Sequence, residues 1–123
     1  MTVSLTRLIL YVQDVEGLKA FYRTHFGLAP GEEIAHEWAV LRAGAFELAL
    51  HRAGPAFRGQ TRPGDGSNAK LVFAVASGLA GLRDALVRDG VPMRELKRFD
   101  GFPYLLCDGE DPEGNVFQLM QAD

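Results

Sequence analysis

Five polar side chains lie inside stretches of alternating apolar residues. They are Arg7 in LTRLILYV, Glu47 and His51 in AFELALH, Lys70 in AKLVFAV and Gln118 in NVFQLMQ. Successive side chains of a β-strand point to opposite faces, so apolar neighbours that pack on a helix turn these residues, with Ala49, to the other face. We therefore expect all six to line the open face of a sheet.

The charges of these side chains decide what that face could bind. Arg7 carries a fork of donors that suits a carboxylate or phosphate, and Lys70 adds a second cation. Either these cations receive an anionic ligand, or they pair with Glu47 in an inert cleft. Gln118 either offers its amide to a ligand or hydrogen-bonds Lys70 or Glu47. As a fallback, Glu47, His51 and Gln118 could form a poor three-ligand metal site.

Aromatic residues could add a stacking surface to such a site. Five of them lie on predicted strands or strand ends: Tyr11, Trp38, Phe99, Phe102 and Tyr104. Aromatic residues on strands belong to the core in most cases. We expect Trp38 and Tyr104 to reach the ligand, and Tyr11 is a further candidate contact because it shares a strand face with Arg7.

The elements that would position these residues occur twice along the chain. In the first half, a strand over 5–13 is followed by a helix that Asp14 caps and Gly27 ends. In the second half, a strand over 70–76 is followed by a helix that Ser77 can cap and Gly90 ends. Further strands are predicted over 32–38, 39–44, 45–52, 91–99, 102–108 and 115–121. A strand, a helix and three strands, repeated, are an internal duplication that constrains the fold.

This repeat predicts an α+β fold of two βαβββ modules whose curled mixed sheets enclose a cleft. We expect a single domain over 1–123, with module one over about 1–53, a linker over about 54–67 and module two over about 68–123. The linker is rich in Gly, Pro and Arg. It is either a lid whose Phe57 touches a ligand or a solvated tether.

Composition excludes several classes of function. The chain has 123 residues, a net charge of −3 and 47% hydrophobic residues, so we expect neither a nucleic-acid-binding nor a membrane-spanning protein. Its single cysteine, Cys107, cannot form an internal disulfide, which favours a cytoplasmic location. The sequence has no nucleophile elbow, phosphate loop or paired-cysteine site.

Three segments resemble the vicinal-oxygen-chelate superfamily, which includes glyoxalase I, extradiol dioxygenases, fosfomycin-resistance enzymes and bleomycin-resistance proteins. They are LILYVQDVEGLKAFYRTHFGL (8–28), KLVFAVASGLAGLRDALVRDGV (70–91) and DPEGNVFQL (111–119). The resemblance implies the fold predicted above and a homodimer. In metal-dependent members, four His, Glu or Gln residues facing the cleft bind a divalent ion.

Those four positions fall here on Arg7, Ala49, Lys70 and Gln118, and a slip of two residues would replace Ala49 by Glu47 or His51. Arginine cannot ligate a cation, and lysine could do so only as a free amine, which its ordinary pKa of about 10.4 disfavours. We therefore expect no metal or other cofactor.

Three functions remain open. The first is a metal-free protein of the bleomycin-resistance type, without catalysis, that binds a small planar or anionic compound. The second is a metal-dependent lyase, isomerase or dioxygenase of glyoxalase type. The third is an interaction domain that has lost its site. The fold alone does not choose among them, because it serves several unrelated chemistries.

Overall fold

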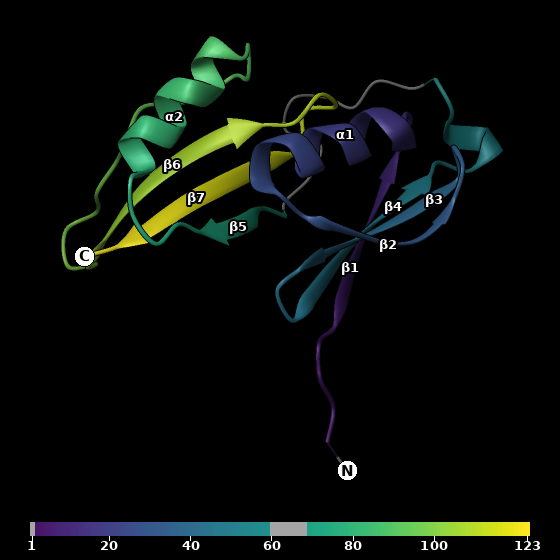
Figure 1. Ribbon diagram of the computed structural model, residues 1–123, viewed down its shortest axis with the longest axis horizontal. Helices are drawn as coiled ribbons and strands as arrows, with labels where there is room; N and C mark the ends of the chain where they lie inside the picture. Colours follow the sequence, from purple (N-terminus) through teal and green to yellow (C-terminus); the bar gives the residue numbers. More distant parts are fainter. Residues whose placement is uncertain (1, 60–68) are drawn as a thin grey trace. The chain divides into compact units, whose positions relative to one another are not determined.

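The computed structural model describes residues 2–59 and 69–123, which form two compact units, one for each predicted module (Figure 1). The predicted α+β class is confirmed by two small sheets with mixed strands and two helices. Most of the predicted linker over 54–67 lies outside the described residues. Its first part contains a 3-10 turn, Pro55–Phe57, in which Phe57 is exposed. The single-domain organisation and the enclosed cleft stay predictions.

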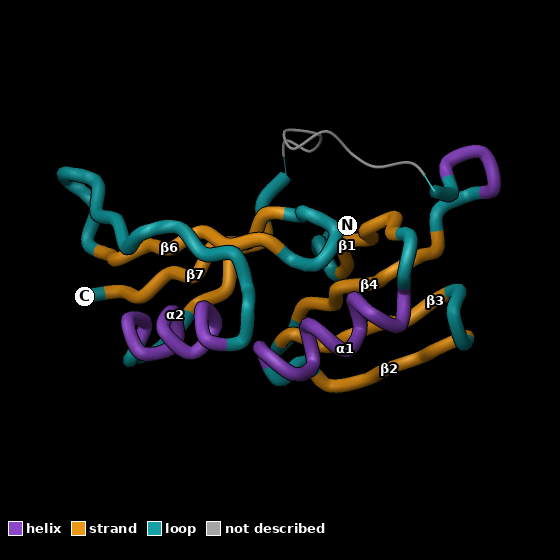
Figure 2. The backbone as a smooth tube through the Cα atoms, turned by 90° about the horizontal axis from the view of Figure 1, so that it is seen from above, coloured by secondary structure: helices purple, strands orange, loops and turns teal. Residues whose placement is uncertain are grey.

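Module one is a four-stranded sheet with one helix. Its elements are β1 (Arg7–Val12), α1 (Val15–Phe26), β2 (Ala29–Ile34), β3 (Trp38–Ala43) and β4 (Phe46–Arg52). The strand order is β1-β4-β3-β2; β1 runs parallel to β4, and the other neighbouring pairs are antiparallel. Helix α1 covers one face of β3 and β4 (Figure 2). The opposite face is the one that the sequence predicts to carry Arg7.

Local sequence explains where α1 begins and ends. Asp14 accepts a hydrogen bond from the backbone N–H of Gly17 at 3.0 Å, as predicted for an N-cap. Gly27 ends the helix with a φ of 65°, a conformation that glycine adopts without a Cβ clash. The buried stripe of the helix is Val15, Leu18, Phe21 and Tyr22. No helix within the described residues is long and apolar enough to cross a membrane.

Module two is a three-stranded sheet with one helix. Its elements are β5 (Leu71–Ala74), α2 (Leu79–Arg88), β6 (Tyr104–Glu110) and β7 (Val116–Ala122). The strand order is β5-β7-β6, with β5 parallel and β6 antiparallel to β7. Helix α2 packs on β7, where Phe117 and Leu119 are fully buried. Gln118 lies between them, so its side chain points to the face away from α2.

The predicted N-cap of α2 is wrong. Gly78, not Ser77, occupies the cap position, with a φ of 77° and no side-chain hydrogen bond of its own. The backbone N–H of Leu79 instead donates to Oε1 of Gln121, at 2.8 Å, from the end of β7. A side chain from a distant strand therefore satisfies the first turn of the helix.

The predicted strand over 91–99 is also wrong, because a bulge interrupts it. Only two isolated bridges join this segment to β6, Met93 to Gly109 and Lys97 to Leu106. Five residues over 93–97 thus face four residues over 106–109, and the extra residue breaks the ladder. Pro92 also lacks a backbone N–H. The side chains between the two bridges therefore do not alternate between the two faces as they would in a regular strand.

The turn between β6 and β7 fixes the register of these strands. Oδ1 of the buried Asp111 accepts the backbone N–H groups of Glu113 and Asn115, both at 2.9 Å. The Asn115 amide also donates to Oδ2 of Asp111, at 2.8 Å. This turn sets the pairing that places Asp108 directly opposite Gln118.

Substitution of Gly109 tests the packing at the bulge. A Cβ on Gly109 would overlap Sδ of Met93 and the ring of the fully buried Phe117. We expect Gly109→Ala to lower the free energy of unfolding by about 1–3 kcal/mol. Gly81→Ala, on α2, is the matched control, because an added Cβ there would have no neighbouring atom within 4 Å. It should raise stability by up to about 1 kcal/mol. Urea unfolding of both variants checks this, and equal effects would contradict it.

Candidate functional site

The predicted site residues fall into two groups, one in each module. Module one holds Arg7, Tyr11, Trp38, Glu47, Ala49 and His51, and module two holds Lys70, Tyr104 and Gln118. Each group is built from side chains on the sheet face away from the helix of its own module. In each group the cation is paired with a carboxylate of its own module.

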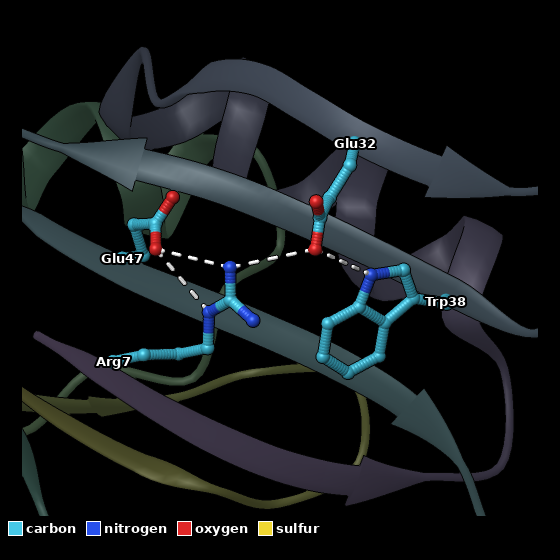
Figure 3. Close-up of polar contacts among 4 residues, drawn as sticks. All are labelled: Arg7, Glu32, Trp38 and Glu47. Carbon is cyan, nitrogen blue, oxygen red and sulfur yellow. Dashed lines mark hydrogen bonds and ion pairs between the residues drawn. The ribbon is translucent and has the colours of Figure 1, made fainter.

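In module one, the Arg7 guanidinium lies between two carboxylates (Figure 3). Its Nη2 is 3.1 Å from Oε1 of Glu47 and 3.4 Å from Oε1 of Glu32, and its Nε donates to Glu47 at 3.2 Å. The indole of Trp38 donates to the same Glu32 oxygen at 3.4 Å, and the guanidinium carbon lies 5.5 Å from the Trp38 ring centroid. Arg7 is thus neutralised within its own module, which supports the internal-pair interpretation.

Strand register explains this cluster. Arg7 of β1 pairs with Glu47 of β4, so Glu47 is the residue beside Arg7. Ala49 pairs with Ile9 and Val40 and is fully buried, so it has no surface to offer a ligand in this structure. Glu32, on β2, was missed, because its place opposite Arg7 depends on the order of strands in the sheet.

The rings of Tyr11, Trp38 and His51 lie together beside the Arg7 cluster, to which Trp38 also belongs. The ring centroids of Tyr11 and His51 lie 5.2 Å apart, and those of Trp38 and His51 lie 5.7 Å apart. Tyr11 is 60% exposed. Nδ1 of His51 lies 2.7 Å from the carbonyl oxygen of Arg52. The group offers a surface for stacking, and the sequence predicted all three of its members as ligand contacts.

The donor set does not fit a divalent cation. Glu47 and His51 are four residues apart on β4, a separation of roughly 13 Å along the strand, so they cannot share one ion through short bonds. Arg7 holds the carboxylate of Glu47 and repels cations. Over 2–59 and 69–123, no cluster of three or more His, Cys, Asp or Glu side chains has metal-binding geometry.

In module two, Lys70 and Gln118 meet at one carboxylate. Nζ of Lys70 lies 2.8 Å from Oδ2 of Asp108, and Nε2 of Gln118 donates to Oδ1 of Asp108 at 3.0 Å. Burial alone would raise the pKa of Asp108, but hydrogen bonds from Lys70 and Gln118 and the nearby Arg94 charge together lower it. Asp108 was missed in the sequence, although it follows the apolar run YLLC; only the β6–β7 register shows that it faces Gln118.

These three residues line a cavity of about 360 Å³, all of whose lining residues belong to module two. Its charged lining consists of Lys70, Arg94, Glu95, Lys97 and Asp108, and the other lining residues are Leu96, Phe99, Leu106, Cys107 and Gln118. The volume falls in the range of small-molecule sites. Tyr104, a predicted contact, is not among the lining residues; its ring packs 5.9 Å from that of Phe102.

The bulged segment supplies one wall of the cavity, and its backbone is held firmly. The Arg94 N–H donates to the carbonyl oxygen of Asp108 at 2.8 Å, and the Arg94 carbonyl accepts Nε of Arg83 at 2.7 Å and Sγ of Cys107 at 3.3 Å. Burial raises the pKa of the Cys107 thiol, which disfavours the reactive thiolate. Arg94 and Lys97 were not identified from the sequence as site residues, because the segment over 91–99 was predicted as a regular strand.

Asp108 should make stability depend on acid pH. Its pKa in the folded protein lies below the ordinary value of 3.8, so its contribution is fully present above that value and is lost as pH falls through the folded pKa. We expect Asp108→Asn, which does not titrate, to lose less stability than the parent between about pH 6 and pH 2. Urea unfolding across this range checks it. Asp84→Asn, exposed on α2, is the control and should follow the parent.

No protein-family model and no curated protein match the sequence. Solved structures do match. The fosfomycin resistance protein FosX from Listeria monocytogenes is 15% identical, with a TM-score of 0.78 over 100% of this chain and 96% of that one. A lactoylglutathione lyase from Agrobacterium tumefaciens is 18% identical, with a TM-score of 0.75 over 98% of this chain and 95% of that one.

A possible glyoxalase from Bacillus cereus is 22% identical, with a TM-score of 0.75 over 97% of this chain and 99% of that one. These proteins belong to one superfamily. At identities of 15–22%, the likeness shows the fold and leaves the activity open. Together with the two modules described above, it confirms the resemblance that the sequence suggested: the chain has the fold of the vicinal-oxygen-chelate superfamily.

Proposed function

We propose that this protein binds a small anionic organic compound in the cavity of module two and holds it without a metal ion. The observation that carries the proposal is the charge of the cavity lining, in which Lys70, Arg94 and Lys97 outnumber Glu95 and Asp108. Cations beside an apolar wall attract an anion and lose less of that attraction to solvent than cations on an open surface.

Glu95 adds little negative charge to this cavity. Its side chain is 93% exposed, and it lies 3.5 Å from Nη2 of Arg83, on α2. Asp108 is already paired with Lys70. The guanidinium of Arg94 and the ammonium of Lys97 therefore remain as positive groups for a ligand. We therefore assign anion binding to this cavity and not to Arg7, which the sequence predicted as the anion-binding residue but whose charge two carboxylates neutralise.

The metal-dependent alternative is supported by the relatives, among which is a lactoylglutathione lyase. The resemblance places metal ligands in such enzymes at the positions of Arg7, Ala49, Lys70 and Gln118. Here two of these four positions carry a guanidinium and an ammonium group, which offer no lone pair to a divalent ion, and each is held in a salt bridge. Homodimer formation and a cytoplasmic location, both expected from the sequence, stay predictions.

Metal content separates the two functions. We expect purified protein, dialysed against nickel, zinc and manganese and then against metal-free buffer, to retain far less than one ion per chain, because lysine and arginine do not ligate divalent ions at neutral pH. Elemental analysis measures this directly. One dialysis-resistant ion per chain would contradict the metal-free proposal and would direct assays to 2-oxoaldehyde adducts and catechols.

Ligand screening tests the binding function itself. We expect small carboxylates, phosphates or sulfonates to shift backbone amide resonances of the cavity lining, while neutral compounds of the same shape bind more weakly. Lys97→Gln removes one lining charge and should weaken anion binding by roughly fivefold, the effect of about 1 kcal/mol. Arg88→Gln makes the same charge change at the end of α2, away from the cavity, and should leave affinity unchanged. If no anion shifts the cavity resonances, the proposed function is wrong.

A further inference from the structure

The three cations of the module-two cavity are not equivalent. Lys70 is held at 2.8 Å by Asp108, and the ammonium of Lys97 lies 5.0 Å from the ring centroid of Phe99. Within the described residues, no hydrogen bond or ion pair engages the Arg94 guanidinium, whereas the backbone of Arg94 is fixed on both sides. Arg94 is therefore a cation on a rigid support with its donors available.

From this arrangement we infer that the ligand is a monocarboxylate with a flat apolar body, bound through the Arg94 guanidinium. The inference rests on the proposed function and names the ligand class of the same site. A guanidinium is planar and meets a carboxylate through two parallel hydrogen bonds, a geometry that an ammonium group cannot reproduce. Arg94 combines such a planar guanidinium with a fixed backbone, so we expect the charged group of the ligand to be a carboxylate.

The cavity provides for a single negative charge. Asp108 lies in the lining, with its carboxylate already holding Lys70 and Gln118. Apart from Arg94, the lining cation that the described residues leave outside a salt bridge is Lys97, and its ammonium lies against the Phe99 ring. A monoanion on Arg94 keeps its charge away from the Asp108 carboxylate, whereas a second negative charge would have to draw Lys97 off that ring or approach Asp108.

The body of the ligand follows from the apolar lining. Leu106 and Cys107 are buried residues of the lining, whereas Leu96 and Phe99 are 38% and 50% exposed. Large apolar side chains left exposed beside a cavity gain stability when a ligand covers them. The Phe99 ring can stack on a flat ligand, and the volume of about 360 Å³ suits a compound of one or two rings.

Four probes on the full chain separate headgroup from body: benzoate, phenyl phosphate, benzamide and acetate. Titration calorimetry gives affinities, and amide NMR shifts locate the binding. We expect benzoate to bind at least roughly tenfold more tightly than benzamide or acetate, and at least as tightly as phenyl phosphate. Relative to benzoate, benzamide lacks the charge, acetate lacks the ring, and phenyl phosphate carries a second negative charge.

Arg94→Gln should weaken benzoate binding by roughly tenfold or more, and Arg94→Lys should restore only part of it. Because the contacts that fix residue 94 are made by its backbone, both variants should keep the parent fold, which their NMR spectra verify. Arg98→Gln is the matched control; Arg98 pairs with Asp123 at 2.8 Å, does not line the cavity and should leave binding unchanged.

The outcomes distinguish the two levels of the proposal. Tighter binding of phenyl phosphate than benzoate, benzamide binding as tight as benzoate, or full benzoate affinity in Arg94→Gln would overturn the ligand class. Other anions could then still occupy the cavity, and the proposed function would stand. If none of the probes and no member of a wider anion panel shifts the cavity resonances, the binding function and the ligand class both fail.

Discussion

The carboxyl group and backbone of Asp108 hold module two together at its candidate site. The side chain binds Lys70, next to β5, and Gln118, on β7, while the carbonyl oxygen accepts the N–H of Arg94 in the bulged segment. One residue of β6 thus joins three other parts of the module. The buried Asp111 turn sets the register that brings Asp108 opposite Gln118, so the site depends on a hairpin turn three residues away.

Module one uses the same kind of interaction at the equivalent position. Arg7 begins β1 and is held by Glu47, as Lys70 precedes β5 and is held by Asp108. In each module, a cation near the start of the first strand is paired with a carboxylate of the same sheet. That carboxylate is on the adjacent strand β4 in module one and on β6, one strand beyond β7, in module two. The resemblance places metal ligands at these cation positions. Here the side chain at each of these positions is engaged in a salt bridge within its own module.

Alternation of apolar and polar residues predicted much of this from the sequence. It placed Arg7 and Gln118 on the faces away from the helices, while residue type alone identified Asp14 as a cap. Alternation did not identify Glu32, Asp108 or Arg94 as site residues. Strand alternation tells which face of the sheet a side chain is on, but it does not tell which side chain lies beside it. Partners depend on strand order, on turn geometry and on where a ladder breaks. The Ser77 cap failed for the same reason: Gln121, forty-two positions from Leu79, supplies the acceptor.

The bulge over 93–97 explains why the available charge lies in module two. A regular antiparallel ladder alternates its side chains between two faces, so Arg94 and Leu96 would share one face and Lys97 would point to the other. One extra residue between the bridges at Met93 and Lys97 breaks that alternation, and successive side chains then line the same cavity. Its cost is a lost stretch of strand pairing, which the bonds from Arg83 and Cys107 to the Arg94 carbonyl offset. An irregular segment that is so well anchored is better explained by the cavity it lines than by the stability of the sheet.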